Sequence, residues 1–222
     1  MSSGKYAIIV AGGSGSRMES KVPKQFLLVN DKPLLFYTIK IFLDTYEDLK
    51  AIVLLPKDYL EQVASLFDGL DLSRIKWEEG GQTRFHSVKN GLKHVDKESI
   101  VFVHDGVRCM VSNSLIEKCY EAALQYGNAI PAVNATDSIR MEDSGINKSV
   151  DRNKIFIVQT PQTFQSNILI DAFNKEYDPL FTDEASVVES MNINIHLVTG
   201  EYQNIKVTRP IDLLIVEHLL QK

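Results

Sequence analysis

A glycine-rich segment that also carries cations follows the first apolar run of the chain. It reads VAGGSGSRMESKVPKQF over residues 10–26, and its glycines are Gly12, Gly13 and Gly15. Glycine has no Cβ, so the backbone N–H groups of such a segment can turn toward an anion without side chains in the way. Arg17 and Lys24 would then match the charge of a triphosphate, both at rest and as charge builds up on a leaving group. The segment therefore predicts a phosphate site; without these two cations, a tight turn with no ligand would be the better prediction.

Neither of the two common phosphate-binding motifs fits this segment. A Walker loop needs Gly-Lys followed by Ser or Thr, and the corresponding residues here are GSRM at 15–18. The dinucleotide fingerprint ends in a glycine where this chain has Met18, and the second apolar run ends in LLPKD without the usual isolated acid. We interpret the remaining cation of the segment, Lys21, as a solvated loop residue.

Composition favours one globular domain that meets an anionic ligand locally. The chain has 222 residues, of which 44% are hydrophobic, and its net charge is -5. A nucleic-acid-binding protein would normally carry a basic excess, so this class is disfavoured. The start MSSGKYAIIV is too short an apolar run for a signal peptide or a membrane span, and the two cysteines are Cys109 and Cys119. We therefore expect a cytoplasmic protein with no disulfide framework and no membrane contact.

Short apolar runs that alternate with longer amphipathic stretches must position the glycine segment. The runs are rich in Val and Ile, as parallel strands buried on both faces should be, and lie at 6–11, 51–55, 100–104 and 128–133. The stretches predict helices at 33–44, 58–67, 83–95 and 113–127, with a last core helix at 209–222. This succession predicts a three-layer α/β/α sandwich, a Rossmann-like fold with a mostly parallel sheet. Ligands of such folds bind beyond the carboxyl ends of the strands, where the glycine segment begins.

The polar segment at 134–160 breaks this alternation. Its DSG sequence predicts a hairpin turn between DSIRM at 137–141 and KIFIVQT at 154–160. A two-stranded excursion is marginal alone, so it is either packed against a partner subunit or an exposed surface hairpin. We find no linker or internal repeat, and predict a single domain over 1–222 that carries this β-arm.

Eight sequence blocks, in order along nearly the whole chain, resemble one family of enzymes. The glycine segment looks like the nucleotide-binding signature of sugar-alcohol-phosphate nucleotidyltransferases, and the blocks narrow the resemblance to the 2-C-methyl-D-erythritol 4-phosphate cytidylyltransferases. The blocks are PKQF (23–26), GGQTRFHSV (80–88), HDGVR (104–108), ATDSI (135–139), VDRN (150–153), TPQTF (160–164), TDEAS (182–186) and NIKVTRP (204–210). The resemblance implies transfer of CMP from CTP to 2-C-methyl-D-erythritol 4-phosphate, with release of pyrophosphate, in non-mevalonate isoprenoid biosynthesis. Such a reaction needs alignment and charge stabilisation rather than a covalent enzyme nucleophile.

The resemblance also implies which residues bind CTP. Arg17 and Lys24 would stabilise the transition state at the α-phosphate and the departing pyrophosphate. The other implied CTP contacts are the glycine-segment residues Ala11, Gly12, Gly13 and Gly15 and the cytosine-reading residues Gly80, Gly81 and Ser87. For Arg84, in the same block as Ser87, a structural role in pinning the loop remains equally open.

A second group of residues is implied to bind the polyol phosphate. Arg152 and Lys206 would clamp its phosphate, and the remaining implied contacts are Asp105, Arg108, Ser138, Thr160 and Thr182. Asp105 would lie near Mg2+, which CTP phosphates would mainly hold, and no protein metal site is predicted. As an alternative, Asp105 at its strand end would cap the next helix. Cys109 stands where the family generally has proline, which predicts a change in loop stiffness.

The arm gains a function from the same resemblance. In the family it crosses to the other subunit, which implies a homodimer in which each active site receives Ser138 and Arg152 from the partner. Phe156, Ile157 and Val158 would be its apolar contacts; a strand within the subunit's own fold is the alternative.

Two other functions are compatible with the residues. Ribitol 5-phosphate cytidylyltransferase shares the glycine segment and PKQF, although VDRN and TDEAS fit the methylerythritol enzyme better. A catalytically silent nucleotide-sensing protein would not need all four cations Arg17, Lys24, Arg152 and Lys206. The five histidines show no metal-like spacing, and we interpret them as ordinary core or surface residues.

Overall fold

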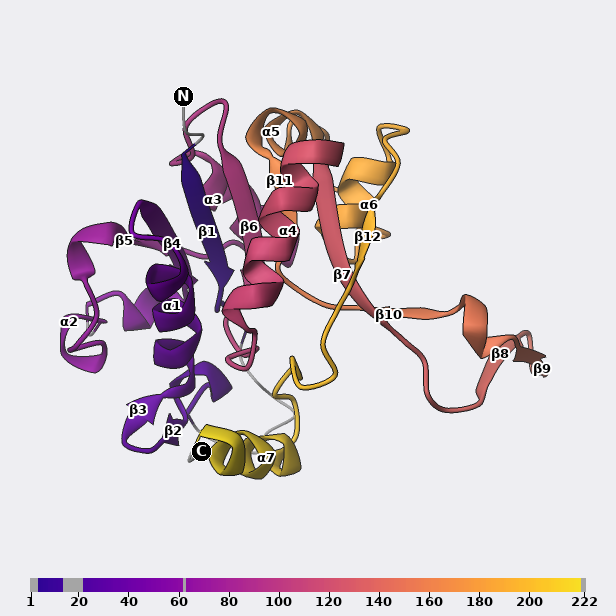
Figure 1. Ribbon diagram of the computed structural model, residues 1–222, viewed down its shortest axis with the longest axis horizontal. Coiled ribbons are helices and arrows are strands. Elements are labelled where there is room, and N and C mark those ends of the chain that lie inside the picture. Colours follow the sequence, from indigo (N-terminus) through magenta and orange to yellow (C-terminus); the bar gives the residue numbers. More distant parts are fainter. Residues whose placement is uncertain (1–3, 14–21, 62, 221–222) are drawn as a thin grey trace.

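A mixed β-sheet forms the centre of the computed structural model, which describes residues 4–13, 22–61 and 63–220 (Figure 1). Its strands lie in the order β10-β7-β11-β6-β1-β4-β5, and β12 pairs with β7. Their bounds are β1 Lys5–Val10, β4 Leu49–Leu55, β5 Ile75–Glu79, β6 Ile100–Asp105, β7 Asn128–Asn134, β10 Phe156–Val158, β11 Gln162–Gln165 and β12 Leu197–Thr199. Two short ladders complete the β-structure: β2 Leu28–Val29 with β3 Lys32–Pro33, and β8 Ile139–Asp143 with β9 Ile146–Val150.

Helices cover both faces of this sheet. Their bounds are α1 Leu34–Thr45, α2 Val63–Leu66, α3 Arg84–Leu92, α4 Asn113–Tyr126, α5 Ser166–Phe173, α6 Glu184–Glu189 and α7 Pro210–Leu220. Alternate residues of β1 point to opposite faces, so Ile9 joins the core under α1 and α4, and Ile8 joins the core under α3, α5 and α6. The predicted three-layer α/β/α sandwich is confirmed, because both faces of the sheet are covered.

The arrangement of the strands singles out the carboxyl ends of β1 and β6. From β1 the chain proceeds to β4 and β5 on one side and then returns to β6 on the other, all in parallel pairs. The order of the strands therefore reverses at β1 and β6, and ligands of open α/β sheets bind at such a point. Val10 and Asp105 are register partners at this edge, and in Figure 1 α7 lies below it.

One of the four predicted parallel strands has different neighbours from those we expected. β7 does not pair with β6, because β11 lies between them and runs antiparallel to both. Pattern reasoning missed β5, β11 and β12. β11 is only four residues long, with the sequence QTFQ, and β5 ends in two glutamates, so neither has the continuous Val/Ile run on which the prediction relied.

Two of the predicted helices differ from the structure. The stretch 58–67 is a 3-10 turn at Lys57–Tyr59 followed by the short α2, because different elements hold its two ends: Tyr59 stacks on Phe26, and Phe67 packs against Trp77. The last helix, α7, is not a core helix. Of its residues only Val216 is buried, and the apolar side chains Ile211, Leu214 and Ile215 are exposed.

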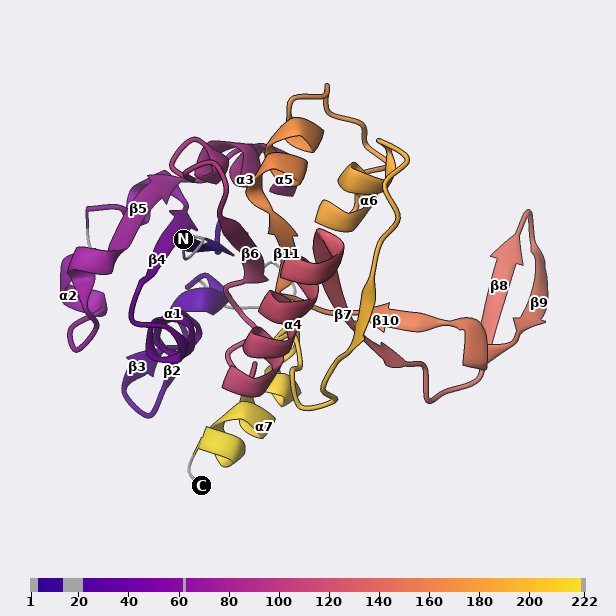
Figure 2. The same ribbon diagram turned by 45° about the horizontal axis from the view of Figure 1, so that its top comes forward.

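The arm is a hairpin that stands off the body of the protein (Figures 1 and 2). Its turn residues Ser144 and Gly145 have φ values of 50° and 82°, as a two-residue type I′ hairpin loop requires. Such a short loop pairs β8 with the residues immediately after the turn, so the second strand is β9 and not the predicted 154–160. The predicted partner segment instead contributes β10, which pairs with β7 at the edge of the main sheet.

The antiparallel strand β11 generates a stability prediction. Phe164 is fully buried at its centre, so Phe164→Ala should lower the free energy of unfolding by about 3–5 kcal/mol through lost burial and a residual cavity. Urea unfolding measures this loss. The control is Leu180→Ala, because Leu180 is 80% exposed and should change stability by less than about 0.5 kcal/mol. Equal losses in the two variants would contradict the packing assigned to β11.

Candidate active site

The loops after β1 and β5 meet at the predicted cytosine-reading residues. The Ser87 hydroxyl, at the start of α3, accepts the N–H of Gly81 at 2.9 Å and donates to the Thr83 carbonyl at 2.9 Å. A Cβ on Gly81 would lie 2.4 Å from the Cβ of His86, so only glycine fits there. Gly80 approaches Gly12 closely: a Cβ on Gly80 would lie 3.8 Å from the Gly12 Cα. The structure therefore brings these predicted residues together.

Within the glycine segment, the structure describes residues 10–13 and 22–26. The N–H of Ala11 donates to the Leu54 carbonyl at 3.0 Å, which holds the segment against β4. Gly12 and Gly13 are exposed, and in this part of the chain their N–H groups donate to no protein acceptor. Two backbone donors are thus available for a ligand. The predicted residues Gly15 and Arg17, and also Lys21, lie outside the described residues.

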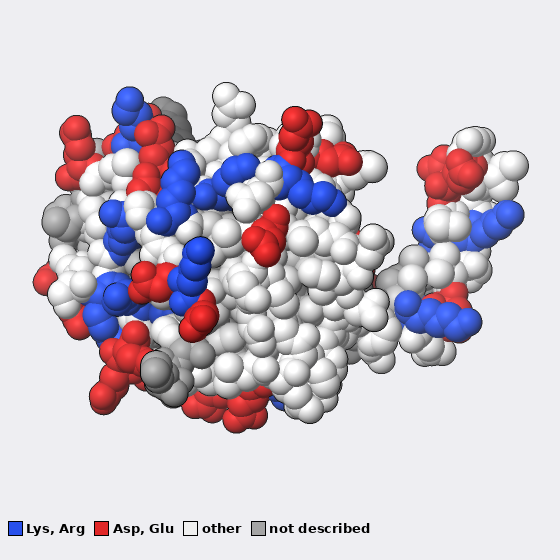
Figure 3. All heavy atoms as spheres, turned by 90° about the horizontal axis from the view of Figure 1, so that it is seen from above, with Lys and Arg blue, Asp and Glu red and all other residues white. Residues whose placement is uncertain are grey.

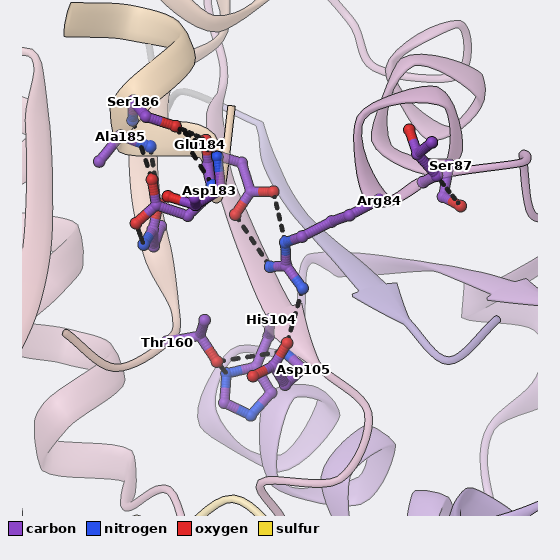
Figure 4. A network of polar contacts seen from close by, with 12 residues as sticks. Arg84, Ser87, His104, Asp105, Thr160, Asp183, Glu184, Ala185 and Ser186 are labelled. Carbon is purple, nitrogen blue, oxygen red and sulfur yellow. Dashed lines mark hydrogen bonds and ion pairs between the residues drawn. The ribbon is translucent and has the colours of Figure 1, made fainter. Parts of the chain in front are cut away.

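Asp105, the last residue of β6, is the centre of a buried charge cluster (Figure 4). One carboxylate oxygen, Oδ1, contacts Nη1 of Arg84 at 2.6 Å. The other, Oδ2, contacts Nε of Arg108 at 3.1 Å and Nζ of Lys206 at 3.0 Å. Burial alone would raise the pKa of Asp105, but these three cations outweigh it and hold the pKa well below its usual range. Asp105 is therefore an anion whose charge is fully matched.

Arg84 links this cluster to α6. Its guanidinium makes a two-pronged ion pair with Glu184, at 2.8 and 2.9 Å, in addition to its contact with Asp105. The Glu184 side chain is 1% exposed, and that of Arg84 is 26% exposed. The structural role that we left open for Arg84 is confirmed, since one side chain pins α3, α6 and β6 together. The alternative role of Asp105 as a helix cap is wrong, because Ser112 caps α4.

Hydrogen bonds from Thr160, His104 and Asn204 fix the orientation of Asp105 and Arg108. Thr160 accepts the backbone N–H of Asp105 at 3.1 Å and shares a hydrogen bond with Nδ1 of His104 at 3.0 Å. The other ring nitrogen of His104 lies 3.0 Å from the carbonyl oxygen of Arg108, and Nη1 of Arg108 donates to the Asn204 carbonyl at 2.7 Å. Burial lowers the pKa of His104 to about 3, so the ring is a neutral core residue near neutral pH.

A cavity of about 140 Å³ opens over this cluster. Its lining includes five predicted residues, Asp105, Arg108, Thr160, Thr182 and Lys206. Lys24 lies on the one-turn 3-10 helix η2, Lys24–Phe26, and its Nζ donates to the Val207 carbonyl at 3.1 Å, which places it one residue from Lys206. The structure thus brings a cation predicted for CTP beside one predicted for the second substrate.

Arg152 and Ser138 do not join this cavity within the subunit. Both are exposed residues of the arm, and Arg152 donates to the Thr136 carbonyl at 2.8 Å. The β10 side chains Phe156, Ile157 and Val158 are 47%, 52% and 38% exposed although their backbone belongs to the main sheet. The alternative of a strand within the subunit's own fold is therefore confirmed for the backbone, while its side chains remain available for contact.

Cys109 fills space in the loop after Asp105. It is buried in an apolar cluster with Val29, Leu34 and Val207, where burial raises the pKa of its thiol to about 12. Its thiol is therefore a neutral packing group. Cys109 and Cys119 are both free thiols.

Sequence reasoning missed four buried polar residues that support the charge cluster around Asp105. They are Glu184, Asn204, Gln159 and Gln162, all buried and polar. Gln162 donates to the Asp183 carboxylate at 2.8 Å and accepts the N–H of Ala185 at 2.8 Å, so it fixes the start of α6. Glu184 and Asn204 lie inside the blocks that carried the resemblance. For Glu184 the sequence did offer a signal, because it directly follows Asp183, a residue type that often begins a helix.

Charges of both signs are interspersed on the face shown in Figure 3, over the body and over the arm. With a net charge of -5, the protein offers no large positive field. Anion binding therefore depends on the local arrangement of cations. Within the described residues no group of three His, Cys, Asp or Glu side chains could hold a metal ion, and no helix is long and apolar enough to cross a membrane.

Exposed glycine N–H groups after β1, and a carboxylate matched by cations at the end of the neighbouring β6, are the features of a nucleotidyltransferase of the α/β class. The family model for 2-C-methyl-D-erythritol 4-phosphate cytidylyltransferase, IspD, matches residues 6–222. The chain belongs to this family.

Similar proteins agree with this assignment. The chain is 41% identical over 218 residues to the 2-C-methyl-D-erythritol 4-phosphate cytidylyltransferase of Bacteroides fragilis, covering 97% of this chain and 99% of that protein. It is 44% identical over 215 residues to the protein of the same name from Bacteroides thetaiotaomicron, covering 96% and 98%. Among solved structures, 4-diphosphocytidyl-2C-methyl-D-erythritol synthase from Anaerococcus prevotii superposes with a TM-score of 0.85 at 27% identity, covering 99% of this chain and 97% of that chain. These findings favour the methylerythritol enzyme over the ribitol alternative.

The buried His104 generates a prediction about pH. Its pKa is lowered on folding, from an ordinary value near 6.5 to about 3, so below pH 6.5 the unfolded chain binds a proton that the folded protein does not. Stability should fall as pH drops through this window, by about 2 kcal/mol between pH 7 and pH 5 from this group alone.

Urea unfolding at pH 7 and pH 5 measures the effect. His104→Gln should lose less stability on acidification than the unaltered protein, by that amount, whereas His218→Gln, at an exposed position, should behave like the unaltered protein. An identical pH dependence in all three proteins would show that His104 is not the responsible group.

Proposed function

We propose that this enzyme carries out its family's reaction, transfer of CMP from CTP to 2-C-methyl-D-erythritol 4-phosphate, in the crevice between the glycine segment and Asp105. The observation that carries the proposal is the hydrogen bond from Lys24 to the Val207 carbonyl, because it places the predicted CTP cation next to Lys206. An attacking phosphate held by Lys206 would thus lie close to the α-phosphate of CTP. The product would be 4-diphosphocytidyl-2-C-methyl-D-erythritol, with pyrophosphate as the leaving group.

For CTP, the base and the triphosphate would use different parts of the crevice. The backbone of Gly80 and Gly81 and the hydroxyl of Ser87 offer donors and acceptors to the edge of cytosine. The free N–H groups of Gly12 and Gly13 would turn to the phosphates, as would Lys24 and Arg17. Such fixed donors stabilise the charge that develops on the pentacoordinate phosphorus and the leaving pyrophosphate without reorganisation.

For the second substrate, Lys206 would exchange partners. Its side chain is 42% exposed, whereas those of Arg84 and Arg108 are 26% and 11% exposed. If Lys206 turns to a substrate phosphate, Asp105 keeps two guanidinium partners and remains an ion. An unpaired buried charge would be strongly destabilising, and this exchange of partners does not create one. Thr160 and Thr182 line the same cavity and would contact the substrate's polar groups.

Mg2+ fits this site as an ion carried mainly by CTP. Magnesium in such sites is usually bound by substrate phosphates with one or two carboxylates, rather than by a cage of protein ligands. Asp105 would be the nearby carboxylate, as the family resemblance implies, and it lines the cavity that would receive the second substrate. When bound, the ion would neutralise phosphate charge as the two substrates come together.

The arm supports a homodimer with shared active sites. It projects from the body with exposed Arg152 and Ser138, and its base carries the exposed apolar side chains of β10. A phosphate clamp made of Lys206 and Arg152 needs both residues at one site, and the arm of a second subunit would supply Arg152. The apolar side chains of β10 would be buried in the same contact, which provides the driving force.

We also propose a cytoplasmic location for the enzyme. The reaction consumes CTP, a metabolite of the cell interior. Cys109 and Cys119 are both free, which suits a reducing compartment.

Lys24→Ala tests the assigned transition-state role. Loss of one well-placed cation should lower turnover by about 100-fold, while CTP binding stays detectable, because the lost interaction strengthens as charge develops. Pyrophosphate release measures turnover, and calorimetric titration measures binding. Lys21→Ala is the control and should retain turnover. Full turnover in Lys24→Ala would remove this residue from the mechanism.

Mixing two inactive variants tests the shared site. Lys24→Ala and Arg152→Ala homodimers should each be nearly inactive. In a mixed dimer, one site would combine an intact Lys24 with an intact Arg152 from the partner arm, so random mixing should restore about a quarter of the activity. The assay is turnover after joint refolding, and mixing each variant with itself is the control. If no activity returns although mixed dimers form, Arg152 serves its own subunit.

A further inference from the structure

A buried glutamine near the end of the glycine segment contacts the backbone at the start of the same segment. Gln25 is 1% exposed and belongs to η2. Its Nε2 donates to the Ala11 carbonyl at 2.6 Å and to the Gly13 carbonyl at 3.1 Å. One side-chain amide therefore holds two peptide groups of the segment to which we assign the triphosphate.

These hydrogen bonds decide which way the free backbone donors point. In a trans peptide the C=O of one residue and the N–H of the next point in opposite directions. Because the Ala11 carbonyl points to Gln25, the N–H of Gly12 points away from Gln25, toward the open side of the segment. In the described part of the chain that N–H donates to no protein group, and Gly12 is exposed. Without the Gln25 amide, this peptide would be free to flip.

The same short turn positions Lys24. Gln25 and Lys24 are consecutive in η2, a single 3-10 turn closed by the hydrogen bond from the Phe26 N–H to the Pro23 carbonyl at 2.9 Å. Lys24 extends from this turn to the Val207 carbonyl. A movement of the buried Gln25 would therefore also move the backbone of Lys24.

We propose that Gln25 is a positioning residue for CTP: it orients the glycine-segment donors and fixes Lys24 relative to them. Gln25 itself is buried and contacts no substrate. The proposal rests on the assignment of the CTP site made above. It extends that assignment by naming the side chain that fixes the peptide groups of residues 11–13 before the nucleotide arrives, which reduces the cost of ordering them on binding.

Two variants remove the anchor, and a third provides a matched control. Gln25→Met keeps the length of the side chain but has no donor, and Gln25→Asn keeps the amide but is too short to reach both carbonyls. The control is Gln165→Met, because the Gln165 amide also donates to two carbonyls, those of Ala123 at 3.2 Å and Leu124 at 3.3 Å. Gln165 is the register partner of Ile100 at the amino-terminal end of β6, far along the strand from Asp105.

The expected result is a selective loss of CTP binding. In both Gln25 variants the calorimetric Kd for CTP should rise about 10- to 100-fold, because two backbone acceptors lose their donor and the segment loses its fixed orientation. The Kd should stay within about threefold in Gln165→Met. In steady-state assays kcat should fall as well, through the displacement of Lys24, while the KM for the polyol phosphate changes less than about threefold. A general loss of packing would raise both KM values together.

Unchanged CTP affinity in a folded Gln25 variant would overturn the proposal, and so would an equal loss in Gln165→Met. If Gln25→Met does not fold, Gln25→Asn decides alone, because it fills most of the same volume with the same polar group. The binding measurement needs no second substrate. An unaltered protein that binds CTP but shows no turnover with methylerythritol phosphate would therefore refute the proposed function and leave the role of Gln25 intact.

Discussion

The structure depends on one buried charge, the carboxylate of Asp105. A carboxylate at the end of a central strand is costly unless its charge is matched, and here three cations from three different parts of the chain match it. Arg84 comes from α3, Arg108 from the loop after β6, and Lys206 from the segment before α7. Each of these segments is held in place because it supplies a partner to the same anion. The cations that would bring two anionic substrates together are thus paired with carboxylates in this structure.

Matching of this kind explains how an acidic protein can have a site for two anions. The single negative charge of Asp105 does not need all three cations at once. The guanidinium of Arg84 is also paired with the carboxylate of Glu184 through two hydrogen bonds. Lys206 is the most exposed of the three cations, so under the proposed function it is the one that would turn to a substrate. Arg84 and Arg108 would then keep the carboxylate of Asp105 paired and the geometry of the cavity unchanged.

Much of this architecture could be predicted from the sequence. The continuous Val and Ile runs predicted β1, β4 and β6, because a strand buried on both faces must be apolar throughout. The glycine segment and Asp105 were correctly assigned to the carboxyl ends of strands. The short β11 could not be predicted, because a four-residue strand with a single phenylalanine shows no hydrophobic periodicity. Its place in the sheet follows from the ladders with β6 and β7, which a local pattern does not contain.

The polar residues behind the site were also beyond pattern reasoning. Gln25, Glu184 and Asn204 are buried by the tertiary structure, and their sequence neighbourhoods look like ordinary loop or helix starts. The arm was recognised as an irregular segment and its turn at DSG was predicted correctly, but its second strand was assigned too far along the chain, because the apolar IFIV run was more conspicuous than the polar β9. Exposed, polar strands are stabilised by their turn and their register rather than by burial, and hydrophobicity does not reveal them.

The connection between the arm and the sheet has a mechanical consequence. The base of the arm, β10, is laddered to β7, β7 to β11, and β11 to β6, the strand that ends at Asp105. A force applied to the arm is therefore transmitted across three rows of backbone hydrogen bonds to the strand that ends in the central carboxylate. On this physical argument the base of the arm would not move independently of the sheet, so a displacement of the arm would reach the edge where Asp105 lies.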